Sequence, residues 1–153
     1  MTVVGFRGAN ARAGRFPAAD AVVSTSPAGI RDAVDFDAET YVVVAAHDFV
    51  DDRLTAEQLF ETDVPYVGLT GLRDRFEEIL DDFDSEGRTF SAADPDRLYT
   101  PVGLDLGGGS TQQVALSVVS GVPAVENERT PQHLRSRAGT IRDRVEVRSD
   151  GGR

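Results

Sequence analysis

The chain has 153 residues, enough for one domain with a hydrophobic core and too few for two domains of ordinary size. Its 26 acidic side chains outnumber its 16 basic ones, all of which are arginine, and the net charge of −10 argues against nonspecific binding to nucleic acid or anionic lipid. No apolar run approaches the roughly 20 residues of a membrane helix, and the absence of cysteine excludes disulfides and thiolate metal sites.

The same features set expectations about where the protein works. The first residues show no basic segment followed by an apolar core, which is the pattern of a signal peptide, so we expect a cytoplasmic protein. An acidic surface without lysine favours a halophilic protein, because dissolved salt screens the self-repulsion of so much negative charge. An ordinary acidic protein from a GC-rich genome, in which arginine replaces lysine, is the alternative.

The first quarter of the chain predicts two short strands and a helix. Residues 2–6 and 21–24 are runs of β-branched and other apolar side chains, which are typical of buried strands. A loop rich in glycine and arginine, residues 7–15, follows the first of them. Ser26 and Pro27 match a helix N-cap followed by proline at the first helical position.

The middle of the chain alternates strand and helix patterns in the same way. Residues 41–46 form the longest apolar run and predict a central parallel strand that is buried on both faces. A helix is expected to start at Thr55, because Gln58 can complete a capping box. Another strand is expected at residues 64–69, and apolar residues at helical spacing predict a helix over residues 73–83.

The last third of the chain is organised around residues 101–115, where an apolar run meets three successive glycines. A short element is expected before it, at residues 98–99. A helix is expected after the glycines, over residues 110–120. The glycine and proline of residues 121–123 are expected to end this helix.

The alternation predicts an α/β fold, a Rossmann-like and mostly parallel sheet flanked by helices. A complete Rossmann unit starts with a strand, a glycine-rich turn and a helix, whereas this chain starts at what would be the second strand, so no NAD motif is visible. We expect one domain over residues 1–125 and a partly ordered, arginine-rich tail over residues 126–153. The uncovered edge of the first strand leads us to expect a homodimer or a partner-bound state.

Polar residues beyond the strand ends are the candidate binding groups, because the ligands of open α/β sheets lie there. His47 and Asp48 follow the central strand and can hydrogen-bond a ligand. Gly68 and Gly71 belong to the next strand and its turn, where the guanidinium of Arg73 can hold a phosphate or carboxylate. For the segment of His47 and Asp48 the structural alternative is a solvated acidic loop. For Arg73 it is a salt bridge to a nearby carboxylate. Two histidines and no cysteine argue against a dedicated transition-metal site.

The glycine turn is the third candidate. Gly107, Gly108 and Gly109 allow positive φ and a close approach of a ligand to the backbone. Ser110 is expected to cap the following helix, with Gln113 as its capping-box partner. Exposed N–H groups and the positive end of the helix dipole favour a phosphate or other oxyanion. A purely structural strand-to-helix turn is the alternative.

Taken in order, these segments resemble the C-terminal Rossmann-type domain of the XdhC/CoxF family, the maturation factors of molybdenum hydroxylases such as xanthine dehydrogenase and carbon monoxide dehydrogenase. The matching segments are residues 15–20, 44–48, 65–71, 101–107, 113–117 and 133–144. The chain departs from the family pattern after Gly71, where it has Leu72, Arg73 and Asp74 in place of a small residue and paired arginines.

The resemblance implies an accessory protein without catalytic residues rather than an enzyme. Such a domain would bind the molybdenum cofactor (molybdopterin), protect it during sulfuration and hand it to the apo-enzyme, with a cysteine desulfurase as a further partner. The resemblance also implies a cofactor pocket made by the strand-end loops. Its residues would be His47, Asp48, Gly68, Gly71, Arg73, Gly107, Gly108, Gly109 and Ser110.

Two other functions stay open. The sequence from Leu104 to Gln112 resembles the phosphate loop of the exopolyphosphatase and apyrase group, which would make the chain a phosphohydrolase in which Asp105 orients metal or water. That fold needs two similar domains and a second phosphate loop, for which this chain has neither the length nor the sequence. A degenerate interaction domain that binds no ligand is the third possibility.

Overall fold

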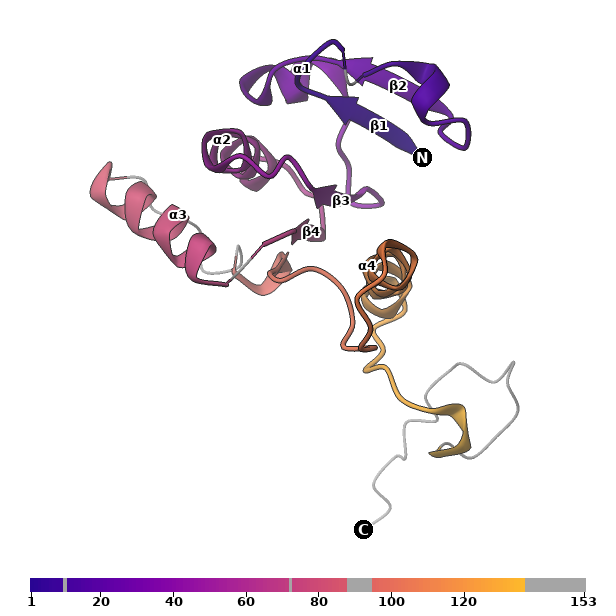
Figure 1. Ribbon diagram of the computed structural model, residues 1–153. Helices are drawn as coiled ribbons and strands as arrows, with labels where there is room; N and C mark the ends of the chain where they lie inside the picture. The colour runs from indigo at the N-terminus through magenta and orange to yellow at the C-terminus, as the bar shows by residue number, and fades with distance from the viewer. Residues whose placement is uncertain (10, 72, 88–94, 137–153) are drawn as a thin grey trace.

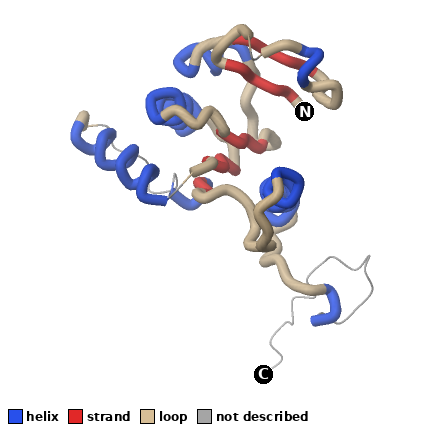
Figure 2. Tube along the Cα trace, viewed as in Figure 1, coloured by secondary structure: helices blue, strands red, loops and turns tan. Residues whose placement is uncertain are grey.

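The computed structural model describes residues 1–9, 11–71, 73–87 and 95–136, which form parallel strands flanked by helices (Figure 1, Figure 2). The strands are β1 (Thr2–Gly5), β2 (Ala21–Ser24), β3 (Tyr41–Val44), β4 (Tyr66–Leu69) and β5 (Leu98–Tyr99). The α-helices are α1 (Ile30–Ala33), α2 (Phe49–Phe60), α3 (Arg73–Ser85) and α4 (Thr111–Glu126). Short 3-10 helices cover Ala13–Arg15, Pro27–Gly29, Pro95–Arg97 and Leu134–Ser136.

The described strands form two parallel groups. β1 pairs with β2, while β4 lies between β3 and β5. Within the described part of the chain, no strand pairing joins β1 to β3. The predicted Rossmann-like, mostly parallel arrangement flanked by helices is confirmed. Its division into two groups falls at the place of the first Rossmann strand, because the usual order of such sheets puts that strand between the second and the fourth.

The core fills one face of the group β3, β4 and β5, beneath α2. Its buried members are Val44, Leu59, Val64, Val67 and Leu69, with Phe36, Val42 and Leu98 packed against them. Because side chains alternate along a strand, the neighbouring Tyr41, Val43 and Tyr66 point to the opposite face. Figure 1 shows α2 and α4 on opposite sides of these strands. The sheet therefore has a closed face under α2 and a second face that α4 covers.

The helix after β3 begins at Phe49 rather than at Thr55, so the predicted start was wrong. Asp48 is the N-cap, and its carboxylate accepts hydrogen bonds from the backbone N–H groups of Val50 and Asp51 at 3.1 and 3.2 Å. Thr55 is buried inside the helix, and its hydroxyl donates to the carbonyl of Asp51 at 2.6 Å. The carboxylate supplies an N-cap about two turns earlier than the threonine pattern indicated.

The helix after the glycine turn continues through Gly121 and Pro123 to Glu126, so the predicted end was also wrong. The missing N–H of Pro123 removes one backbone hydrogen bond, and Gly121 lies so near Tyr66 that a Cβ there would be 3.3 Å from the hydroxyl. Asn127 then closes the helix with its backbone N–H and its side-chain amide, which donate to the Pro123 carbonyl at 3.1 and 2.7 Å. The predicted tail lies outside the described residues from residue 137 onward.

Candidate functional site

The loops that follow β3 and β4 lie side by side at the carboxyl end of the sheet. The backbone N–H and the hydroxyl of Thr70 both donate to the carbonyl of Val44, at 3.0 and 3.2 Å. These hydrogen bonds join the loop that carries His47 to the loop that carries Gly71 and Arg73. Two of the three predicted groups of binding residues therefore start at the same sheet edge.

His47 and Asp48 differ in how far the chain already engages them. His47 is exposed and has a φ of 58°, a left-handed conformation that is uncommon for residues with a side chain. The Asp48 carboxylate caps α2, and a guanidinium nitrogen of Arg7, in the loop after β1, lies 3.8 Å from it. The same nitrogen lies 3.6 Å from a carboxylate oxygen of Asp51. Asp48 thus caps α2 and forms an ion pair with Arg7, while His47 extends into solvent.

Packing and backbone conformation explain why the β4 segment has glycine at Gly68 and Gly71. A side chain at Gly68, inside β4, would overlap the side chain of Val102 and crowd the ring of Tyr66. Gly71 has a φ of 130°, which strains any residue other than glycine. Arg73 is the first residue of α3, and its side chain lies outside the part of the chain that the structure describes.

The glycine turn is held together by the capping box that the sequence predicts. Ser110 accepts a hydrogen bond from the N–H of Gln113 at 3.3 Å, while Gln113 Oε1 accepts from the N–H groups of Gly109 and Ser110 at 3.2 and 3.1 Å. Gly107 and Gly108 have φ values of 70° and 86°, and a Cβ at Gly108 would lie 2.6 Å from the Gln113 amide. The N–H groups of Gly109 and Ser110, which the sequence analysis assigned to a phosphate, therefore donate to Gln113 within the chain.

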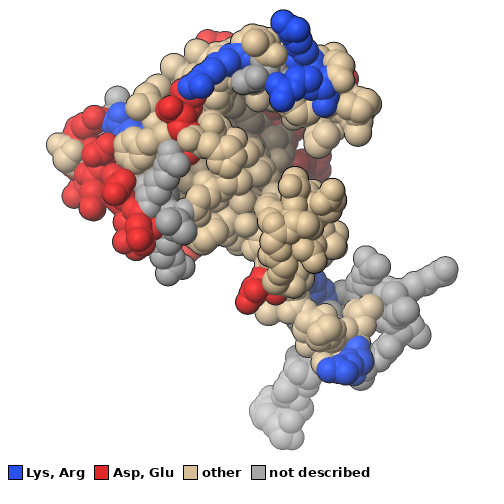
Figure 3. Space-filling view, viewed as in Figure 1, with Lys and Arg blue, Asp and Glu red and all other residues tan. Residues whose placement is uncertain are grey.

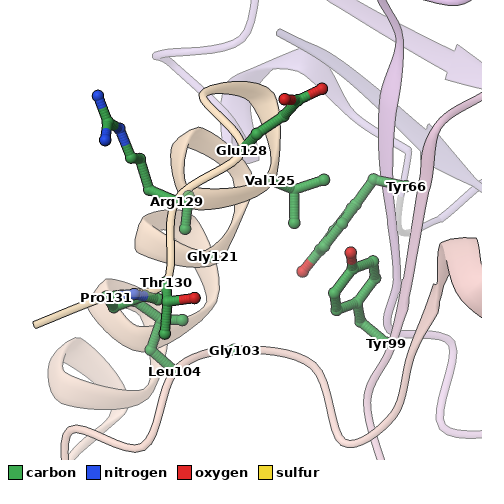
Figure 4. A pocket seen from close by; sticks show the side chains of 11 residues that line it. Tyr66, Tyr99, Gly103, Leu104, Gly121, Val125, Glu128, Arg129, Thr130 and Pro131 are labelled. Carbon is green, nitrogen blue, oxygen red and sulfur yellow. The ribbon is translucent and has the colours of Figure 1, made fainter. Parts of the chain in front are cut away.

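A pocket of about 470 Å³ opens between α4 and the sheet face that lies opposite the core (Figure 4). β4 and β5 contribute Tyr66 and Tyr99, whose rings stack with their centroids 4.5 Å apart. Gly121 of α4 and Gly103 lie across from the rings. Figure 4 shows the Tyr66 hydroxyl pointing toward Gly121 and the Arg129 guanidinium turned away from the two rings. The interior of the pocket is thus aromatic and apolar, with hydroxyl groups as its polar points.

Tyr66 supplies a polar group without a partner. The residue is 0% exposed, and its hydroxyl oxygen has no hydrogen-bond partner among the described residues. Burial, and to a smaller extent the neighbouring Tyr99, raise the pKa of the Tyr66 phenol above its ordinary value of 10.0. The hydroxyl therefore stays neutral and can both donate and accept. A buried polar group that faces a cavity is well placed to recognise a ligand.

Sequence reasoning missed this pocket, since none of the nine residues predicted for binding lines it. The signal that could have found it is the alternation of side chains along the strands. Tyr41 and Tyr66 fall on the face opposite the buried valines, and their ring centroids lie 6.3 Å apart. Gly121, interpreted as a helix stop, is the small residue that makes room beside Tyr66.

Across the described ranges, no cluster of three or more histidine, aspartate or glutamate side chains is arranged to hold a metal ion. In the same ranges, no helix has the length and apolar character that crossing a bilayer requires.

Comparisons with known proteins place the chain among relatives. A family model described as the XdhC Rossmann domain matches residues 1–122. A curated protein of Bacillus subtilis (strain 168), named as a probable subunit of xanthine dehydrogenase, is 28% identical over 120 residues, which are 78% of this chain and 34% of that protein. A crystal structure described as a xanthine dehydrogenase from Bacillus halodurans has a TM-score of 0.70 and 24% identity, and the match covers 83% of this chain and 36% of that one.

The two relatives are similar to this chain over part of their length. The likeness to the Bacillus halodurans structure is one of fold. The chain spans about a third of the length of each relative. The activity of the whole relatives can therefore only be proposed for this chain.

Proposed function

Because the chain belongs to the family of XdhC Rossmann domains, we propose that it is a maturation factor for molybdenum hydroxylases such as xanthine dehydrogenase. The match over residues 1–122 and the names of the two relatives support this proposal. Its cargo would be the molybdenum cofactor. Its partners would be the apo-enzyme that receives the cofactor and a cysteine desulfurase. The chain would act by binding and transfer rather than by catalysis.

The strand-end edge fits part of such a cargo. His47 is exposed there and can exchange hydrogen bonds with a ligand. Arg73 begins α3 at the same edge, and we expect its guanidinium to hold the phosphate. The Asp48 carboxylate fits less well, because it already accepts two N–H bonds and repels a negative phosphate. In the glycine turn, the N–H groups of Gly109 and Ser110 could bind a phosphate only after their hydrogen bonds to Gln113 break.

The tyrosine pocket fits the ring end of the cargo. A flat heterocycle can pack against the aromatic and glycine surfaces between Tyr99 and Gly121. Its polar edge can then pair with the hydroxyl of Tyr66, which has no partner among the described residues, if the ring shifts enough to expose this buried oxygen to the pocket. This hydroxyl is the observation on which ligand binding chiefly rests.

Titration of the purified chain with isolated molybdenum cofactor tests the proposal. We expect saturable binding that Tyr66→Phe weakens by about tenfold, since one hydrogen bond is worth about 1.4 kcal/mol. Gln112→Ala, on the exposed side of α4 and outside the pocket, is the matched control and should bind like the unmodified chain.

Three outcomes of this titration have different meanings. The absence of saturable binding by the intact chain would contradict the proposal. Unchanged binding by Tyr66→Phe, together with lost binding by His47→Ala, would assign the cargo to the strand-end edge. Release of phosphate from ATP or polyphosphate with Mg²⁺, abolished by Asp105→Asn, would support the phosphohydrolase alternative instead.

A further inference from the structure

The turn that ends α4 has a glutamate at a position that favours glycine. The N–H of Glu128 donates to the carbonyl of Val125 at 2.9 Å, and the N–H of Arg129 donates to the carbonyl of Ala124 at 2.7 Å. Together with the C-cap Asn127, these two bonds form a Schellman turn. Glycine usually occupies the left-handed position of such a turn, because a side chain is strained there. Glu128 holds this position with a φ of 51°.

The charge of Glu128 is also unfavourable for folding. The residue follows the carboxyl end of α4, where the helix dipole favours a cation over an anion. Its carboxylate adds to a net charge that is already −10. Within the described part of the chain, no salt bridge compensates this carboxylate. Backbone conformation and charge thus both lower stability, which indicates that Glu128 serves something other than the fold.

Glu128 lines the pocket beneath α4. Among the described residues that line this pocket, it is the one with an acidic side chain. Figure 4 shows its carboxylate on the Tyr66 side of the turn and the guanidinium of Arg129 on the opposite side. Glu128 therefore adds a carboxylate to a pocket whose walls are aromatic, glycine and apolar surfaces.

A carboxylate fits a ligand edge that presents two parallel N–H donors. On a flat heterocycle, an aminopyrimidinone ring has such an edge, made by a ring N–H and the adjacent exocyclic amine. Pterins and guanine share this ring. A dione ring has a carbonyl in place of the amine, and the carbonyl oxygen repels a carboxylate. A phosphate is repelled for the same reason, so the ring end of a ligand is the end that faces Glu128.

We propose that Glu128 selects the ligand of this pocket by its aminopyrimidinone ring. The inference rests on the proposed function, in which the cargo is a pterin. The two carboxylate oxygens accept hydrogen bonds from the ring N–H and the amine, while the ring packs between Tyr99 and Gly121. Xanthine has a dione ring and is rejected, so the substrate of a xanthine dehydrogenase would not compete with the cargo.

Titration calorimetry of the full chain with pterin and with lumazine tests the inference, because lumazine is the pterin ring with a carbonyl in place of the amine. We expect the unmodified chain to bind pterin at least about tenfold more tightly than lumazine. Glu128→Gln should reverse this preference, since an amide accepts from the ring N–H of lumazine and donates to its carbonyl. Glu126→Gln, at the end of α4 and outside the pocket, is the matched control and should keep the preference for pterin.

Glu128→Gly separates recognition from folding. Glycine is favoured at positive φ and removes a negative charge from the end of α4, so the melting temperature should rise by about 3 °C. The preference for pterin over lumazine should be lost in the same variant. A residue with a purely structural role would change the melting temperature and leave the preference as it was.

The outcomes distinguish this inference from the proposed function. Equal affinities of the unmodified chain for pterin and lumazine would overturn the inference, and so would a preference that both Glu128 variants retain. The proposed function would stand in either case if the chain binds isolated molybdenum cofactor. Failure to bind pterin, lumazine and the cofactor would contradict both. Guanosine, titrated in parallel, separates the two sources of the ring, because tighter binding of guanosine than of pterin would identify a guanine base as the ligand.

Discussion

At the scale of single residues, Tyr66 is the position where burial and polarity conflict. A buried hydroxyl without a partner costs about 1–3 kcal/mol of folding free energy. Tyr66→Phe removes the hydroxyl and keeps the ring that stacks on Tyr99. We expect this variant to raise the free energy of unfolding by about 1 kcal/mol at neutral pH, measured by urea denaturation. Tyr99→Phe, on a half-buried residue, is the matched control, and a smaller effect is expected.

The same variant should change the response to alkaline pH. Below pH 10 the phenol is protonated in the folded and unfolded chain alike. Above pH 10 the unfolded chain loses the proton first, because burial raises the pKa of Tyr66 in the folded protein, so stability falls as the pH rises toward the folded value. Tyr66→Phe should lack this part of the decline. Identical alkaline unfolding of the two chains would show that the phenol is not buried in solution.

The positions of the candidate residues relative to the strands were easier to predict than their contacts. The sequence placed His47 and Asp48 beyond a strand end, and the structure has them there. It could not show that the Asp48 carboxylate turns back to cap α2, because an aspartate after a strand suits a ligand and a helix N-cap equally well. Gly68 carried no sign of its contact with Val102, since that contact depends on how a distant loop packs.

At the scale of elements, the glycine turn and α4 form one unit. The reciprocal bonds between Ser110 and Gln113 satisfy N–H groups that the first turn of a helix leaves free. Ser110→Ala should lower the free energy of unfolding by about 1 kcal/mol, measured by thermal or urea denaturation. Gln112→Ala, on the same turn and outside the cap, should cost far less. Equal effects of the two substitutions would mean that the cap adds no stability.

The ends of elements show where local patterns stop being informative. The starts at Ser26 and Ser110 were predicted and are confirmed, because each cap is made by residues adjacent in sequence. The end of α4 was not predictable from Gly121 and Pro123, because its continuation depends on packing against β4. The residues that line the tyrosine pocket come from β4, β5 and α4 and the segment after it, so their meeting is a property of the fold.

At the scale of the whole molecule, charge sets the response to salt. The net charge is −10, and Figure 3 shows acidic side chains gathered over α3. Dissolved salt screens this repulsion, so we expect the melting temperature to rise between low and molar KCl, as in a halophilic protein. A thermal scan at matched pH measures it, and sucrose at equal osmolality is the control. Equal stability at both KCl concentrations would favour an ordinary acidic protein.

The α/β architecture was accessible from the sequence because strand and helix patterns alternate strictly along it. The interruption between β1 and β3 was anticipated as a missing first strand, from the order of motifs. The exposure of Val43, at 40%, was not anticipated, because it depends on what lies above the sheet and not on the strand-like sequence of β3.

The three tyrosines of the chain give it an internal reporter. The chain has no tryptophan, and Tyr41, Tyr66 and Tyr99 form one row of neighbouring rings. Intrinsic ultraviolet emission therefore originates at a single location, the sheet face beneath α4. A ligand in the pocket should alter this emission without any added label. Rearrangement of the core beneath α2 should leave it almost unchanged.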